Sequence, residues 1–470
     1  MPPTLALGLA YLFVFWAYRQ DAKQFPYPDA ALWLPTIWIM RCASRGLDYW
    51  FGGGDAGRLD PILIGVLFVL AVATVVRRGF PLGAIAASNV ALFSFYAYLV
   101  VSVTWVATLQ DPAIKVLRPI GDLAMALIVV SQPDPRKAIM TVFRRCAILL
   151  IPMSVVLVKY YPDLGRMADK NWGQDSWIGV TTHKNPLGQL CMVAAIGYVD
   201  HFVQQRRQGL KWRKQIPTFV LLLLTGYLLF DGGENSRSST TILCMILATG
   251  LYWLFGYMRK RVAVVMRFIY GFAFALGFVA VVLSFAGTSL QAVVAGLFGK
   301  APTLTDRTYL WADVIRIGGE NPILGSGYGG FWVPSTFAKL SPEVDNSPME
   351  AHNGYLETFA NLGLVGDALL AWLILASVRD AARGMADDFE YHRLRLTMLI
   401  TVAVMNYSEA TFPRGMHLWW FGFLIFAVSP RAFVRPKKVQ PAETAAPTTA
   451  VYEPQPNEHP PITVPCRSLM

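Results

Sequence analysis

The stretch DPILIGVLFVLAVATVVRR, residues 60–78, decides the class of fold. It holds an apolar run near 60–76 that ends at Arg77 and Arg78. A bilayer offers the backbone no hydrogen-bond partner, so a run of roughly 20 apolar residues forms a membrane-spanning helix. The stretch therefore predicts a helix that crosses a membrane and ends in a basic linker.

Similar apolar runs recur along the whole chain. Of its 470 residues, 54% are hydrophobic and 15% are charged, whereas soluble domains carry about 25% charged residues. The run near 31–50 is interrupted by Pro35, Arg41 and Arg45, so its helix is expected to be short, tilted or re-entrant. The sequence predicts an all-α, polytopic membrane protein with about 12 transmembrane helices. The further runs lie near 3–18, 82–104, 113–131, 138–159, 186–204, 216–233, 237–257, 263–285, 353–378, 395–412 and 415–433.

The formal net charge of +11 does not indicate a nucleic-acid partner. The basic residues lie in short clusters between apolar runs, which is the pattern produced by the excess of Lys and Arg in cytoplasmic loops. We therefore assign the basic linkers at 77–78, 132–137, 205–215, 258–262, 379–394 and 431–438 to the cytoplasm. The remaining linkers then alternate to the outer face, at 105–112, 160–185, 232–236, 286–352 and 412–414.

The two ends of the chain differ in character. The N-terminal MPPTLALGLAYLFVFWAYRQ has no basic region before its apolar run, so we interpret it as the first membrane helix and not as a cleaved signal peptide. We expect a membrane domain over 1–434 and a disordered, Pro-rich cytoplasmic tail over 435–470. Five cysteines occur without CxxC spacing, so they predict neither a disulfide framework nor a zinc site.

TTHKNPLGQL, residues 181–190, places polar residues directly before an apolar run. Asn185 at an N-cap and Pro186 at the first helical position predict a helix start. His183 and Lys184 then have two interpretations. They anchor the helix at the membrane surface, or they form an anion site together with the helix N-terminus.

DGGENSRSSTTIL, residues 231–243, places Arg237 in a tight outer turn, against the charge bias of that face. Arg237 either extends to the lipid headgroups, or pairs with Glu234, or belongs to a site with its neighbouring serines.

The large outer loop contains TLTDRTYLWADVIRIGG, residues 303–319. Thr305 or Asp306 could cap a short amphipathic helix, and its aromatic residues suit a helix that lies on the membrane surface. Arg307 is then either a solvated charge at the helix start or a functional group. The stretch GSGYGG, residues 325–330, matches the G-x-G-x-x-G pattern of dinucleotide-binding sites. That pattern requires a preceding strand and a following helix, which are not expected here, so we interpret the stretch as a flexible turn.

MEAHNGYLETFANLGLVG, residues 349–366, begins the next apolar run. His352 and Asn353 stand at its start, as His183 to Asn185 do before theirs. A histidine at this position is either an interfacial residue or a general base, since its pKa suits proton transfer near neutral pH.

These polar clusters all fall at the same predicted face of the membrane. Lys and Arg gathered there would bind a diphosphate, because guanidinium groups form paired bonds to phosphate oxygens. A histidine beside them could take a proton from an attacking hydroxyl. Inside the run 113–131, Arg118 either pairs with Asp122 at i, i+4 or lines a path for a lipid headgroup.

The chain resembles the O-antigen ligase and exopolysaccharide polymerase superfamily. The resemblance rests on HKNPLG, the SRS turn, DRTYLW followed by NPILGSGYGGFW, and AHNGYLETFANLGLVG, in this order over roughly residues 160–410. The stretch LWLPTIWIM near the N-terminus is similar to the exopolysaccharide polymerase branch. One departure is Asp306 before Arg307, where the family commonly has a glycine, and its carboxylate could compete for the guanidinium.

The resemblance implies a GT-C-like, metal-independent glycosyltransferase without cofactors in a bacterial inner membrane, with its active site facing the periplasm. The donor would be a glycan on undecaprenyl diphosphate, and transfer to a sugar hydroxyl would invert the configuration. Arg237 and Arg307 would hold the diphosphate, His352 would orient or deprotonate the acceptor, and Lys184 and Asn185 would extend the anion site. His183, Asn353 and Arg118 are further candidate binding residues.

The acceptor separates two enzymatic readings of the resemblance. A polymerase joins repeat units of a surface polysaccharide, whereas a ligase transfers the finished glycan to lipid A-core. A flippase and a chain-length regulator are further expected partners. A third possibility is a transporter of polysaccharide or lipid, for which polar groups at mid-membrane and two similar halves are expected; the sequence shows no internal repeat.

Overall fold

The computed structural model describes residues 1–26, 29–52, 57–106, 110–168, 175–231, 237–261, 264, 266–267, 271, 307–342, 344 and 348–433. Residues Met1–Phe433 form one compact unit. The tail 435–470, most of the run 263–285, and Thr305 and Asp306 lie outside the described residues, so the expectations for them stay predictions. Within the described ranges the strands form a single antiparallel pair, β1 with β2, and the other regular elements are helices.

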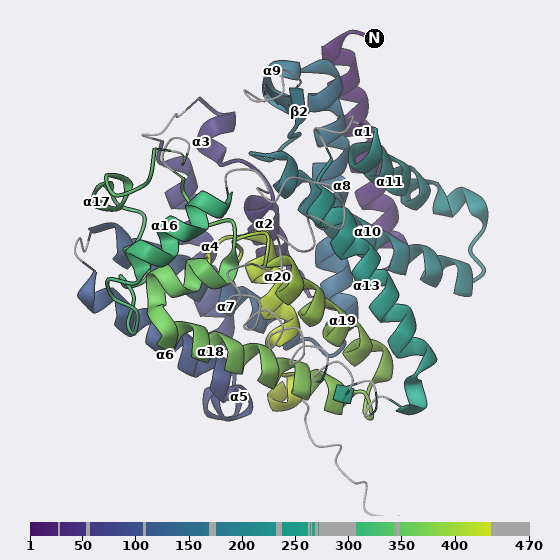
Figure 1. Ribbon diagram of the computed structural model, residues 1–470. Helices are drawn as coiled ribbons and strands as arrows, with labels where there is room; N and C mark the ends of the chain where they lie inside the picture. Colours follow the sequence, from purple (N-terminus) through teal and green to yellow (C-terminus); the bar gives the residue numbers. More distant parts are fainter. Residues whose placement is uncertain are drawn as a thin grey trace, which may run out of the picture. The chain divides into compact units, whose positions relative to one another are not determined.

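The first half of the unit contains the helices and the strand pair that lead up to residue 207 (Figure 1). They are α1 (Pro3–Gln24), η1 (Ala30–Leu32), α2 (Trp33–Cys42), α3 (Leu47–Trp50), α4 (Leu59–Arg77), α5 (Leu82–Ser88), α6 (Val90–Ser102), η3 (Val103–Trp105), α7 (Gln110–Val130), α8 (Pro135–Tyr160), α9 (Pro162–Gly165), β1 (Arg166–Ala168), β2 (Asp175–Trp177) and α10 (Lys184–Arg207).

The second half contains the long helix α18 and the helices around it. Its elements are α11 (Trp212–Phe230), α13 (Ser239–Tyr257), η4 (Arg259–Arg261), α16 (Arg307–Gly318), α17 (Pro334–Phe337), α18 (Gly354–Gly384), α19 (Phe389–Met405), α20 (Leu418–Ala427) and η5 (Pro430–Phe433). Side chains cap helices in both halves. Asp134 accepts a hydrogen bond from the amide of Lys137 at the start of α8, and Asp388 accepts one from the amide of Tyr391 at the start of α19.

The predicted apolar runs that lie within the described residues form helices. Among the described residues, α4, α8, α10, α13 and α18 are long and apolar enough to cross a membrane. A sixth span results if α5 and α6 are one bent span, with 102° between them. The other described helices that match predicted runs are shorter or more polar. The chain is therefore a helical protein with several membrane-spanning segments, and the number of about 12 spans stays a prediction.

Two of the predicted runs form broken helices, and only the second of these breaks was predicted from the sequence. The run 82–104 bends at Asn89, whose side chain bonds the carbonyl of Ile85 and the amide of Ser429. The run near 31–50 gives the ten-residue helix α2 and the single turn α3, so the expectation of a short helix is confirmed there.

α20 lies at the centre of the unit (Figure 1). All ten of its residues, LWWFGFLIFA, are buried, and it packs against α7, α19, α18, α10 and α2. A helix that is apolar on every face needs protein or lipid on every side. Here the surrounding helices cover α20 on every side, so the turn between α19 and α20 is attached to a fully packed helix.

The segment GSGYGG is tightly packed, so its interpretation as a flexible turn is wrong. Gly325, Gly327 and Gly329 all have φ between 68° and 81°, where a side chain is strained. A Cβ on Gly325 would lie 2.5 Å from the amide nitrogen of Gly363. Gly363 itself interrupts α18 with φ 64°, and the amides of Leu364 and Val365 bond the carbonyls of 322 and 323. The outer segment is thus inserted into a break in α18.

α16 packs on the first turns of α18 (Figure 1). Leu310 and Val314 are buried there in a second small core with Phe331 and Ala360, while Tyr309 and Ile315 are about half exposed. The helix is present from Arg307, and Leu310 and Val314 of its predicted apolar face pack on protein, while its contact with a membrane surface stays a prediction.

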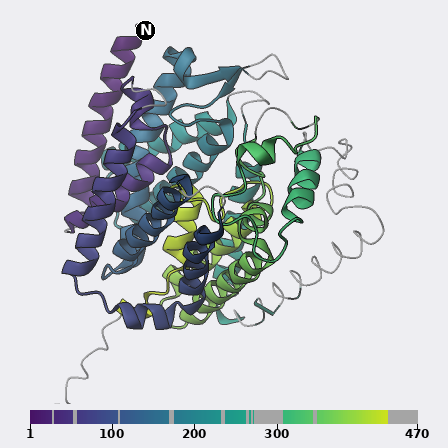
Figure 2. The same ribbon diagram turned by 90° about the vertical axis from the view of Figure 1, so that its left-hand side faces the viewer.

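The structure also relates the N-terminal segment to the rest. The amide and the side chain of Arg45 bond the carbonyls of Val180 and Thr181 at 3.0 and 2.9 Å. At the other end of this segment, α1 lies at the edge of the unit (Figure 2) and Gln24 bonds the carbonyl of Lys214. The linker after α2 therefore meets the predicted outer loop 160–185, and the end of α1 meets a predicted cytoplasmic linker.

Candidate active site

The turn between α19 and α20 is built around the buried side chain of Asn406. Its carbonyl oxygen accepts from the amides of Thr411 and Phe412 and from the Thr411 hydroxyl, at 2.9 to 3.0 Å. Its amide group donates to the carbonyl of Val402. Because each hydrogen-bonding group of this buried amide has a partner, the turn has one defined conformation.

This turn holds the start of α18. The amide of Gly354 donates to the carbonyl of Asn406 at 2.7 Å, and a Cβ on Gly354 would lie only 2.1 Å from Asn406 Oδ1. Asn353 caps α18 through the amides of Tyr355 and Leu356. Its side chain thus fixes the start of the helix directly after His352.

The residue before this cap, His352, has an unusual backbone. Its φ is 49°, a region that non-glycine residues rarely adopt. The preceding residue, Ala351, is held on both sides: its amide donates to Glu357 and its carbonyl accepts from Trp311 of α16. Backbone strain of this kind persists where the surrounding structure imposes it, often at functional sites.

Arg307, Asn185 and His352 converge on the same turn from three different elements. Arg307, at the start of α16, donates from Nη1 to the carbonyl of Ser408 at 2.8 Å. Asn185, in the first turn of α10, donates to Glu409 Oε1 at 2.7 Å. Glu409 is within electrostatic reach of both Arg307 and His352. These three residues thus meet around Glu409, an acidic residue that the sequence did not single out.

The charges of the site act on one another. Partial burial lowers the pKa of the His352 imidazole below its usual value of 6.5, and Arg307 lowers it further. The carboxylates of Glu409 and Glu357 oppose this shift. Burial raises the pKa of Glu409, and Arg307 and His352 counteract the rise. His352 is therefore neutral at neutral pH, in the form that accepts a proton.

Glu350 joins His352 to a second arginine. Its Oε1 lies 3.0 Å from Nδ1 of His352, without the angles of a good hydrogen bond, and its Oε2 pairs with Arg414. Burial lowers the pKa of Arg414. Tyr328 supports this end of the turn, since its hydroxyl bonds the carbonyl of Pro413 and the amide of Gly415.

Arg118 lies beside this second arginine. A Cβ on Gly415 would lie 2.8 Å from Cβ of Arg118, and Arg118 acts electrostatically on Arg414. Arg118 acts electrostatically on Asp122, but the hydrogen bonds described for the Asp122 carboxylate come from Trp38 Nε1 and from the amide of Met416. Arg118 is exposed, so its side chain is accessible at the edge of the site.

Among the described residues, Arg237 contacts its own turn and not the turn between α19 and α20. The guanidinium of Arg237 donates twice to the carbonyl of Phe230, at 3.0 and 2.6 Å. Its turn nevertheless reaches the site, because Thr240 Oγ1 lies 3.5 Å from the Ser408 hydroxyl. Glu234, its predicted alternative partner, lies outside the described residues.

The start of α10 differs by two residues from the prediction. His183 is the N-cap and the helix begins at Lys184, so Asn185 is free to bond Glu409 from inside the first turn. His183 is exposed and lies within electrostatic reach of His352, Arg45 and Lys184.

Sequence reasoning missed Glu409, Glu350 and Arg414. Arg414 had the same signal as Arg237, an arginine in a predicted outer linker where basic residues are depleted. The two glutamates had no local signal, because their significance depends on neighbours more than 50 residues away in sequence, such as Asn185 and Arg414.

Two comparisons with known proteins bear on this arrangement. Residues 219–371 match the family model described as O-antigen ligase. The exopolysaccharide production protein ExoQ of Rhizobium meliloti (strain 1021) is 26% identical over 303 residues, which cover 62% of this chain and 65% of the relative. The alignment thus spans slightly less than two thirds of that relative.

The matched family segment runs from α11 into α18 and contains Arg237, Arg307 and His352. It ends before the turn that carries Glu409 and Arg414. With the quoted motifs in order and the family model matched across the centre of the chain, the protein is similar to the O-antigen ligase and polymerase-like family.

Proposed function

We propose that the protein transfers a glycan from undecaprenyl diphosphate to a sugar hydroxyl at the outer face of a bacterial inner membrane, and that it thereby polymerises the repeat units of an exopolysaccharide or O-antigen. The observation that carries the proposal is the meeting of a proton-accepting His352 with Arg307 at the turn between α19 and α20.

His352 would act as the base. Its Nδ1 side faces Glu350, so Nε2 is left to take the proton of the acceptor hydroxyl. The acceptor oxygen attacks the anomeric carbon, the new glycosidic C–O bond forms, and the bond from that carbon to the diphosphate oxygen breaks. The leaving diphosphate keeps the electron pair, and attack from the opposite side inverts the configuration.

The basic residues would stabilise the leaving group. Arg307 holds its position through Ser408, and Lys184 stands at the start of α10, where the helix dipole adds positive potential. Preorganised positive groups lower the barrier because they need no rearrangement as charge develops on the diphosphate. Arg237 and Arg118 would bind more distant parts of the same lipid diphosphate. Activation resides in the diphosphate, so the proposed transfer uses no metal, cofactor or nucleotide sugar.

The glutamates would set the geometry. Glu409 connects α10 to the turn that holds Arg307, and Glu350 places a negative charge between His352 and Arg414. That charge stabilises the imidazolium formed after proton transfer. Both are positioning residues in this scheme.

A polymerase is favoured over a ligase because the relative is described as an exopolysaccharide production protein. The description of the family model as O-antigen ligase supports the second candidate, transfer of a finished glycan to lipid A-core. A transporter is less well supported, since neither the family model nor the relative is described as a transporter.

Deletion of the gene followed by analysis of lipid-linked glycans distinguishes the two enzymes. A polymerase mutant accumulates single repeat units on undecaprenyl diphosphate. If long chains still form and remain on the lipid, the polymerase assignment is wrong and the ligase assignment stands. A flippase and a chain-length regulator are partners that such a polymerase would need.

A further inference from the structure

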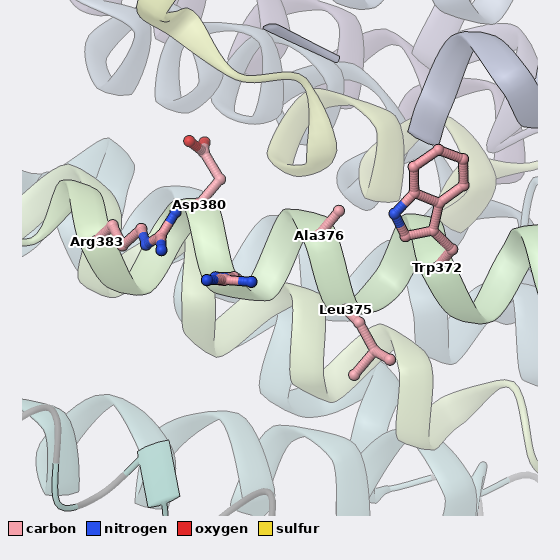
Figure 3. Close-up of a pocket in the computed structure, with 6 residues that line it drawn as sticks. Trp372, Leu375, Ala376, Asp380 and Arg383 are labelled. Atoms are coloured by element: carbon pink, nitrogen blue, oxygen red, sulfur yellow. The ribbon is translucent and has the colours of Figure 1, made fainter. Parts of the chain in front are cut away.

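A groove lies on the half of α18 that is remote from the candidate active site (Figure 3). We name it the α18 groove; its volume is about 520 Å³ and it is lined by Trp372, Leu375, Ala376, Arg379, Asp380 and Arg383. Trp372 and Leu375 are 45% and 54% exposed, so the apolar part of the groove is open. Arg379 and Arg383 lie one and two turns further along, at the end of α18 that the charge alternation assigns to the cytoplasm.

The charge of this groove is positive in spite of its aspartate. Asp380 is bound by two arginines from outside the groove: its carboxylate lies 3.0 Å from Arg395 and 3.1 Å from Arg431. Arg379 and Arg383 are exposed, and within the described chain neither guanidinium has an ion-pair partner. Two arginines are thus available to an anion at the edge of an apolar surface.

A second groove, formed by different helices, repeats this arrangement. The α1 groove has a volume of about 350 Å³ and is lined by Phe15, Tyr18, Arg19, Asp21, Trp33 and Arg145, with Ala22. Its aspartate is likewise paired with an arginine from outside the groove, since Asp21 accepts a hydrogen bond from Arg144 at 2.8 Å. Arg145 lies over the ring of Trp33 at 4.4 Å, and its Nη1 has no partner in the described chain.

We infer that both grooves bind an anionic phospholipid. The phosphodiester would lie between the two arginines, which form strong charge-assisted bonds to phosphate oxygens. An acyl chain would lie along the exposed Trp372 and Leu375, or along Phe15 and Trp33. A lipid whose headgroup carries an additional ammonium is disfavoured, because that cation would meet the arginines.

The alternative is that these arginines extend to the headgroups of any lipid without selecting one. The two explanations differ in selectivity. Extension to headgroups predicts no preference between single lipids in detergent, whereas a built groove predicts one. Neither explanation depends on glycan transfer, so the outcome is independent of the proposed function.

The test is native mass spectrometry of the full-length protein in detergent, titrated separately with phosphatidylglycerol and phosphatidylcholine of the same acyl chains. The wild-type protein should retain phosphatidylglycerol in preference. Each basic residue near a membrane surface strengthens the attraction of anionic lipid by about fivefold, so Arg379→Gln with Arg383→Gln should weaken one class of site by about 25-fold. Arg19→Gln should weaken the other class by about fivefold.

The matched control is Arg206→Gln with Arg207→Gln, which removes the same charge from two exposed arginines at the end of α10 that line neither groove. Retention should be unchanged in this control. Equal retention of the two lipids by the wild-type protein, or an equal loss in the control and the α18 groove variant, would overturn the inference. Added inorganic phosphate should not displace the lipid; if it does, the grooves are simple phosphate sites and the inference is also wrong.

Discussion

At the scale of single residues, the proposed glycan transfer depends on His352. Hydrogen bonds to the amide and the carbonyl of Ala351 hold the backbone of His352 in its left-handed conformation. Its ring contacts Glu350 and interacts electrostatically with Arg307 and Glu409. This placement distinguishes His352 from His183, which is exposed at the start of α10.

The first prediction compares these two histidines. Removing a general base typically lowers a rate by roughly 100- to 10,000-fold, so His352→Ala should reduce the rate of transfer by that amount. His183→Ala should change it less than tenfold, because this ring is exposed at the start of α10 and its side chain does not cap the helix. The measurement is initial transfer rate with protein amounts normalised in the membrane, and equal losses in the two variants would contradict the assignment.

The pH dependence of transfer follows from the charges around His352. A base must be neutral to act, so activity is present above the pKa of His352 and is lost as the pH falls through it. Since burial and Arg307 lower this pKa below 6.5, the midpoint of the fall in kcat/KM should lie below pH 6.5.

Two substitutions should move this acid limb in opposite directions. Arg307→Gln removes a nearby positive charge and should move the limb to higher pH. Glu409→Gln removes a negative charge and should move it to lower pH. The limb is measured as kcat/KM against pH in each variant. A limb at the same pH in both variants would show that another group titrates.

At the scale of elements, α16 is the part of the outer loop that carries Arg307 to the site. Buried residues such as Val314 form the contact of α16 with α18. Val314 is fully buried, while the adjacent Ile315 is 54% exposed. Neighbouring positions on one helix thus provide a matched pair of opposite burial.

Truncation at these two positions should have different consequences. Val314→Ala leaves a cavity under α16 and should cost about 2 kcal/mol of folding free energy, with a loss of activity as Arg307 shifts. Ile315→Ala should cost less than about 0.5 kcal/mol. Thermal unfolding of the two purified variants measures the difference, and equal midpoints would show that α16 is not held by this face.

The elements were predicted unevenly, for physical reasons. Hydropathy identified the helices because a bilayer requires long apolar runs, and charge alternation placed Arg307 and His352 on one face. It could not show the break of α18 at Gly363, which arises from an inserted segment 40 residues earlier in sequence. Local capping rules also placed Asn185 wrongly, because its bond to Glu409 spans 224 residues.

At the scale of the whole molecule, the predicted orientation has a structural counterpart. The linkers that meet at the candidate site belong to the predicted outer set, and the structure adds the linker after α2 through Arg45 and Thr181. The charge pattern left the N-terminal side open, and this contact joins the linker after α2 to the predicted outer set.

Orientation can be measured on single cysteines placed in a variant without native cysteines. Tyr49→Cys, in the linker after α2, should react with a membrane-impermeant maleimide added outside spheroplasts. Gln208→Cys, in the predicted cytoplasmic linker, should react only after the membrane is opened. Both residues are on exposed turns of the structure. Labelling with the opposite sidedness would invert the proposed topology.

The most direct test of the central claim is transfer by the purified protein. The wild-type protein receives a glycan on undecaprenyl diphosphate together with an acceptor glycan, and the products are separated by mass. The account predicts a lengthened glycan with an equal amount of free undecaprenyl diphosphate, and neither product above background with His352→Ala. Unchanged product formation by His352→Ala, or transfer without release of the lipid diphosphate, would contradict it.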